Sequence, residues 1–222
     1  MCIRLLFVLV FLLPLFACSD PNERNEKGQT LLNLAAEAGD LQRVQELLDD
    51  GADLSLRDHC LWTPLLRAAA NGHNEIAELL LQRGADPDDQ DEGLYSTVMV
   101  AAGNNHPQVI DLLLQHGANI DLTDGTLGWT ALIWAAREGH AESIRVLMRH
   151  HADANIRDQS GNTALTWAVQ KGHIGVVKAL LDAGVPPNQT DSEGNTALTI
   201  AARMGKREIL NALISALDND KK

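Results

Sequence analysis

The stretch DQSGNTALTWAVQKGHIGVVKALLDAG, residues 158–184, decides the fold of this chain. In it, Thr163 precedes the small residue Ala168 by five positions. A threonine, or once a serine, followed five residues later by alanine occurs six times, with four spacings of 33 residues and one of 34. A fixed period of this length indicates a solenoid of stacked units, not a globule around one central cleft. The six anchor residues are Thr30, Thr63, Ser96, Thr130, Thr163 and Thr196.

Each unit carries the start and stop signals of two short helices. The anchor hydroxyl is suited to cap the first helix, and a glycine such as Gly172 separates the two helices. In the second helix, the pair Leu180-Leu181 recurs with apolar residues three or four positions earlier, which predicts one buried face. Gly184 follows, where a left-handed residue ends the helix, and His151 takes this place in unit four.

The second unit carries a recognisable family signature. It reads Thr63-Pro64-Leu65, Ala68-Ala69, Gly72-His73, Leu79-Leu80 and Gly84-Ala85-Asp86, which resembles the ankyrin repeat. The resemblance runs from residue 25 to about residue 217. It implies an all-α ankyrin-repeat solenoid of six helix-turn-helix units with β-turn fingers. It also implies that the histidine after each inter-helix break is structural and bonds to neighbouring backbone (His73, His106, His140 and His173).

The N-terminus has the pattern of an export signal. Residues 5–17 form an apolar run interrupted only by Pro14, behind a start with one basic residue, Arg4. This run is shorter than the roughly 20 residues of a membrane helix. We therefore expect a signal peptide over residues 1–17, a lipidated N-terminus and tether over 18–24, six repeats over 25–217 and a polar tail over 218–222.

The end of the apolar run resembles a bacterial lipobox. Leu15, Ala17 and Cys18 fit that pattern, and Phe16 is bulkier than its usual residue. The resemblance implies a lipid on Cys18, and Ser19 after it favours the periplasmic face of the outer membrane over the inner membrane. The alternative is ordinary signal-peptidase cleavage near Ser19.

Charge and cysteine usage narrow the function. With 18 Lys+Arg and 30 Asp+Glu, the net charge is −12, which argues against nucleic-acid binding and favours a basic partner. Beyond Cys2 and Cys18, the sequence has only Cys60, so no internal disulfide is expected in the mature protein. The sequence has none of the common catalytic, phosphate-binding or metal-binding motifs, which predicts a non-enzymatic protein without cofactor or metal. We also expect it to be a monomer.

The expected partner site follows the position just before each anchor. Trp62, Tyr95 and Trp129 occupy it in three consecutive units, and exposed aromatics dominate binding hot spots. The alternative is that each packs sideways on the next finger. Trp134 and Trp167 are interpreted as core residues. The other partner-binding candidates, on the inner helices, are Arg67, Asn71, Asn104 and Arg137, with Glu138 and Lys171 beside them.

Three functions are compatible with these features. The first is a protein-protein interaction scaffold anchored in the bacterial cell envelope. The second is an immunity protein that neutralises a secreted antibacterial effector. The third is an enzyme or peroxide-stress accessory factor that uses the Cys60 thiol, and it requires that thiol to be reactive.

Overall fold

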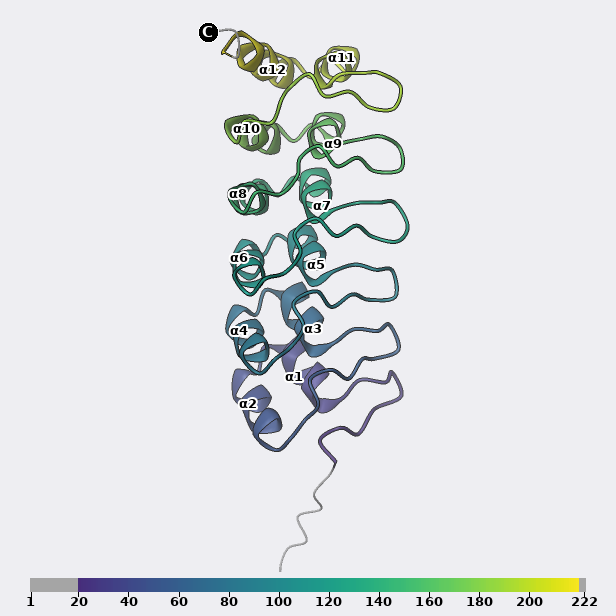
Figure 1. The fold of residues 1–222 in the computed structure, drawn as a ribbon, viewed down its shortest axis with the longest axis vertical. Helices are drawn as coiled ribbons and strands as arrows, with labels where there is room; N and C mark the ends of the chain where they lie inside the picture. Colours follow the sequence, from purple (N-terminus) through teal and green to yellow (C-terminus); the bar gives the residue numbers. More distant parts are fainter. Residues whose placement is uncertain (1–19, 220–222) are drawn as a thin grey trace, which may run out of the picture.

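The computed structural model describes residues 20–219, which form a solenoid of six stacked helix-turn-helix units (Figure 1). These residues contain twelve helices and no strand, so the predicted fold and repeat number are confirmed. One column holds the first helix of each unit: α1 (Leu31–Ala38), α3 (Pro64–Asn71), α5 (Thr97–Gly103), α7 (Ala131–Glu138), α9 (Ala164–Lys171) and α11 (Ala197–Arg203). The other holds the second: α2 (Leu41–Asp49), α4 (Asn74–Gln82), α6 (Pro107–Gln115), α8 (Ala141–Arg149), α10 (Ile174–Asp182) and α12 (Arg207–Asn219).

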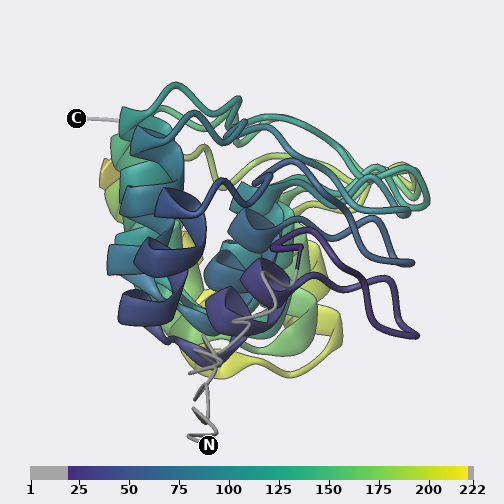
Figure 2. The same cartoon turned by 90° about the horizontal axis from the view of Figure 1, so that it is seen from below.

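The first column forms the inner layer, from which a finger-like turn projects between successive units (Figures 1 and 2). The anchor hydroxyl caps each inner helix as predicted, because it accepts a hydrogen bond from the backbone N–H three residues later in all six units. Small buried side chains such as Ala68 and Ala69 let neighbouring inner helices approach closely. His151 has a φ of 64°, which confirms the left-handed helix end predicted there.

Both ends of the array extend beyond the expected boundaries. Residues 20–24 were expected to be a tether, but Arg24 forms a β-bridge with Thr30, and the Asn22 side chain accepts a hydrogen bond from Asp53 N–H at 2.8 Å. Residues 20–24 thus contact the first unit. Helix α12 ends at Asn219, so residues 218 and 219 of the predicted tail belong to this helix. The predicted signal peptide and Cys18 lie outside the described residues.

Within residues 20–219, no helix has both the length and the apolar character needed to cross a membrane.

Two fingertips carry leucine in a backbone conformation that favours glycine. Leu61 and Leu94 both have a φ of 61°, and their equivalents in other units include Gly28 and Gly161. A left-handed conformation costs an L-residue about 1–2 kcal/mol. Leu61 and Leu94 are also 44% and 47% exposed, so burial does not offset the strain. At these two fingertips, an exposed apolar side chain is present although it lowers the stability of the fold.

Leu61→Gly and Leu94→Gly should each raise the free energy of unfolding by about 0.5–1 kcal/mol, because relief of strain exceeds the extra flexibility of glycine in the unfolded chain. Urea unfolding of the purified protein measures the change. Leu127→Gly is the matched control, because Leu127 is an exposed fingertip residue without a positive φ. It should lower stability by about 0.5–1 kcal/mol. Equal effects at Leu61 and Leu127 would contradict the strain argument.

Candidate functional site: the groove between fingers and inner helices

An aspartate near the start of the finger organises each unit from the second to the sixth. Its Oδ1 atom accepts backbone N–H bonds from the fingertip: Asp158, for example, receives Ser160 N–H at 2.9 Å and Asn162 N–H at 2.8 Å. The fourth finger has one residue more, which accounts for the single 34-residue spacing, and Asp124 accepts three such bonds. These aspartates were not among the predicted site residues, although aspartate recurs at this position of the sequence in five successive units.

In units two, three and five the second carboxylate oxygen accepts a hydrogen bond from a side chain outside the fingertip. Trp62 Nε1–H donates to Asp91 Oδ2 at 3.1 Å, and Trp129 Nε1–H donates to Asp158 Oδ2 at 3.1 Å, in each case across to the next finger. The sideways packing that the sequence left open as an alternative therefore occurs for both tryptophans. Trp129 is only 6% exposed, so the expectation that it projects freely toward a partner is wrong.

Trp129 is buried because two neighbouring indoles enclose it. Its ring centroid lies 4.8 Å from that of Trp134 and 5.4 Å from that of Trp167, both in edge-to-face arrangements. Tyr95 continues this series, with its centroid 5.5 Å from that of Trp134. We call these four residues the aromatic ladder. Trp134 and Trp167 pack against the core as predicted, yet both remain partly exposed in the groove.

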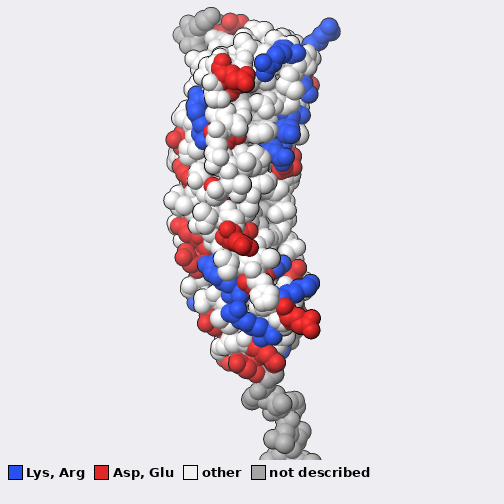
Figure 3. Space-filling model, turned by 90° about the vertical axis from the view of Figure 1, so that its right-hand side faces the viewer, with Lys and Arg blue, Asp and Glu red and all other residues white. Residues whose placement is uncertain are grey.

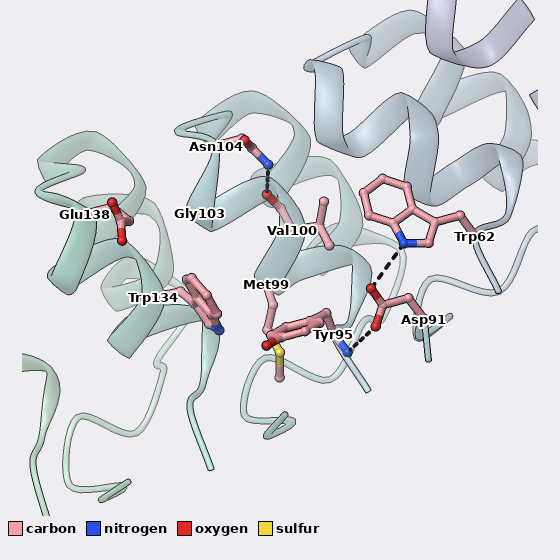
Figure 4. Close-up of a pocket in the computed structure, with 9 residues that line it drawn as sticks. All are labelled: Trp62, Asp91, Tyr95, Met99, Val100, Gly103, Asn104, Trp134 and Glu138. Atoms are coloured by element: carbon pink, nitrogen blue, oxygen red, sulfur yellow. Dashed lines mark hydrogen bonds between the residues drawn. The ribbon is translucent and has the colours of Figure 1, made fainter. Parts of the chain in front are cut away.

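A cavity of about 260 Å³ opens where the ladder meets the second finger (Figure 4). Trp62 and Trp134 lie on opposite sides of it, with Tyr95 between them. The cavity exists because unit three carries Val100 where units four and five carry tryptophan, and Gly103 where they carry Arg137 and Gln170. Its lining consists of Trp62, Asp91, Tyr95, Met99, Val100, Gly103, Asn104, Trp134 and Glu138.

The polar residues predicted to bind a partner are two asparagines and two arginines, and they lie in different surroundings. Asn104 lines the cavity, and its Nδ2 donates to Val100 O at 2.8 Å. Asn71 lies outside the cavity, is exposed, and donates to Arg67 O at 2.9 Å. Arg67 and Arg137 are held over indole rings: Arg67 Cζ lies 4.8 Å from the Trp62 ring centroid and Arg137 Cζ lies 5.1 Å from that of Trp129.

The electrostatics of the finger aspartates differ from unit to unit. Burial would raise the pKa of Asp58, but hydrogen bonds from Arg67 and from the backbone N–H groups of Trp62 and Cys60 outweigh it, so that pKa is lowered. Asp124 is 4% exposed, and its Oδ2 atom has no hydrogen-bond partner among the described residues. Burial, and then the charges of Asp124 and Asp91, raise the pKa of Tyr95. The cavity thus has a negative environment.

The histidines are structural, as the resemblance implied. His73, His106, His140 and His173 each place Nε2 at 3.0–3.1 Å from a carbonyl oxygen of the preceding unit, to which Nε2–H donates. Among residues 20–219, no three His, Cys, Asp or Glu side chains converge as metal ligands. Cys60 is exposed on the second finger as a free thiol.

The finger side of the solenoid has an uneven charge distribution (Figure 3). Uncharged side chains cover much of its middle around one central Asp/Glu cluster, while Lys, Arg, Asp and Glu side chains are more numerous toward both ends. Taken together, the stacked units, the fingers and the groove define a repeat protein whose surface is built for contact with another macromolecule.

Comparison with known proteins identifies the family. The model of the ankyrin-repeat family matches residues 5–91, 98–191 and 150–222, and the chain therefore belongs to that family. The crystal structure of an ankyrin repeat domain from Acinetobacter baumannii is 32% identical, with a TM-score of 0.76 over 83% of this chain and 96% of that one. Tonsoku-like protein of Bos taurus is 49% identical over 43 residues, which are 19% of this chain and 3% of that protein. Ankyrin repeats are a scaffold for protein-protein interaction.

Trp129→Ala should lower the free energy of unfolding by about 3–5 kcal/mol, because it removes a buried indole and leaves Asp158 without one donor. Trp62→Ala should cost less, since the Trp62 ring is only partly buried. Urea unfolding of both variants gives the comparison. A smaller loss for Trp129→Ala than for Trp62→Ala would contradict the structural role assigned to Trp129.

Proposed function

We propose that the protein is a protein-protein interaction scaffold anchored in the bacterial cell envelope, at the periplasmic face of the outer membrane, through a lipid on Cys18. The observation that carries the binding function is the groove of units two to four, where Trp62 and Tyr95 border a cavity and Leu61 and Leu94 stand exposed at the adjacent fingertips. Aromatic side chains in a pocket are typical binding hot spots.

The anchoring part of the proposal rests on the sequence of residues 1–19. The apolar run and the Leu15-Phe16-Ala17-Cys18 ending support export and lipidation. The first described residues lie at the end of the solenoid that holds α1 (Figure 1). A lipid on Cys18 would therefore leave the groove of units two to four free for a partner.

Cys18→Ser should move the protein from the membrane fraction to the soluble fraction of the envelope, because the thioether cannot form. Fractionation with metabolic labelling by radioactive palmitate measures both properties. Cys60→Ser is the matched control and should keep both label and membrane attachment. A Cys18→Ser protein that still carries label, or still sediments with membranes, contradicts lipidation at Cys18.

Trp62→Ala should reduce crosslinked capture of a partner from native envelopes at least about tenfold, since hot-spot truncations cost 2 kcal/mol or more. The Leu61→Gly/Leu94→Gly variant should also reduce capture while it unfolds at higher urea concentration than wild type, which separates loss of binding from loss of fold. Gln115→Ala, on the exposed side of α6, is the control and should capture normally. Equal capture by all variants would mean that the partner binds to a surface other than this groove.

A further inference from the structure

The tryptophans of the groove differ in whether a cationic side chain lies over the indole ring. Arg67 lies over Trp62, Arg137 over Trp129, and Lys171 over Trp167, with the Lys171 Nζ atom 5.6 Å from the ring centroid. Among the described residues, Trp134 is the one tryptophan without such a cation. A cation over an indole face gains about 0.5–2 kcal/mol. The Trp134 ring, which lines the cavity, lacks this interaction.

The sequence explains the difference. Lys171 reaches Trp167 because it lies four residues later on the same helix, α9. The residue four positions after Trp134 is Glu138, the last residue of α7. Unit four therefore places a carboxylate where unit five places an ammonium group, and this carboxylate also lines the cavity.

The remaining charges of the cavity have the same sign. Its lining includes the carboxylates of Asp91 and Glu138 and no Lys or Arg. Arg67 lies outside the lining and is paired with Asp58 and Glu37. Arg137, beside the cavity, is paired with Glu138 and placed over Trp129.

The buried carboxylate of Asp124 adds to this negative environment. Its Oδ2 atom lacks a hydrogen-bond partner, as does the buried Nε1–H group of Trp134, whereas the corresponding oxygens of Asp91 and Asp158 accept indole N–H bonds. Its charge acts on Tyr95, which forms the cavity wall between the two tryptophans. The charge of Asp124 therefore adds to that of Asp91 and Glu138, and all three favour a cation over an anion in the cavity.

We propose that this cavity binds one cationic side chain, lysine or arginine, presented by a basic segment of the protein partner. The aliphatic stem would pack between Trp62, Val100 and Met99, and the charged group would reach the face of Trp134 and the carboxylate of Glu138. The volume of about 260 Å³ lies below the range of about 300–1,000 Å³ that is typical of small-molecule sites and suits a single side chain. The inference rests on the proposed function, since it names the chemistry of the partner at that site.

Peptides with and without the charge test the proposal directly. The probes are acetyl-Gly-Gly-Lys-Gly-Gly-amide, the same peptide with arginine, and the same peptide with norleucine, which keeps the lysine stem without its ammonium group. Titration into the wild-type protein, followed by the indole N–H resonances in NMR, should show binding of the lysine and arginine peptides at least about tenfold tighter than the norleucine peptide. Equal or tighter binding of norleucine, or no binding of any peptide, overturns the proposal.

Glu138→Lys supplies the internal cation that unit five already has. It should weaken binding of the lysine peptide at least about tenfold, because it removes the carboxylate and places an ammonium group over Trp134. A lysine at the end of α7 also suits the helix dipole, so the fold should be kept. Glu142→Lys on α8 is the matched control, because it makes the same charge change at an exposed site on the outer layer.

Binding within about twofold of wild type is expected for Glu142→Lys, since an exposed charge at a distance is screened by salt. Equal losses for Glu138→Lys and Glu142→Lys would mean that overall charge, not the cavity, attracts the peptide, and would overturn the proposal. The experiments distinguish failure of the cationic site from failure of the scaffold function. Partner capture that depends on Trp62, without discrimination between lysine and norleucine, would leave the scaffold function standing and remove only the cationic site.

Discussion

The finger aspartate is the interaction on which the groove depends. One carboxylate oxygen accepts hydrogen bonds from the N–H groups of the fingertip. In units two, three and five the other oxygen accepts from a side chain of the preceding finger or of the inner helix of its own unit, as Asp158 does from Trp129 and Trp167 at 3.1 and 2.8 Å. In unit four the Oδ2 atom of Asp124 has no partner among the described residues. A buried charge of this kind is tolerated only when it is hydrogen-bonded. The aspartate thus shapes the turn in units two to six, and in units three and five it also joins consecutive turns and fixes the orientation of Trp62 and Trp129.

The binding features arise where units depart from their neighbours. Val100 and Gly103 leave space in unit three that larger side chains fill in units four and five, and Glu138 replaces a cation. Leu61 and Leu94 accept backbone strain at the fingertips beside this space. Strained backbone and exposed apolar side chains together are a common mark of a functional surface, since neither benefits the folded state.

The sequence predicted the fold well because the period, the capping threonine or serine and the left-handed helix ends are local signals that recur along the chain. It predicted the groove only in part. Whether Trp129 is exposed depends on the indoles of two adjacent units, and no local pattern shows that Trp134 and Trp167 enclose it. The docking of residues 20–24 depends on a bond between Asn22 and Asp53, a contact across 31 positions. The space for the cavity corresponds to the smaller residues Val100 and Gly103 of unit three, but its volume also depends on how Trp62, Tyr95 and Trp134 are oriented around it.

Photo-crosslinking at single positions tests whether the groove of units two to four is the surface that contacts the partner. A photoreactive amino acid at Asn104, on the rim of the cavity, should crosslink one partner in intact cells. The same residue at Gln115, exposed on the outer helix α6, should give no crosslink to that partner. Crosslinks from Gln115 and none from Asn104 would contradict the account and move the interface to the outer layer.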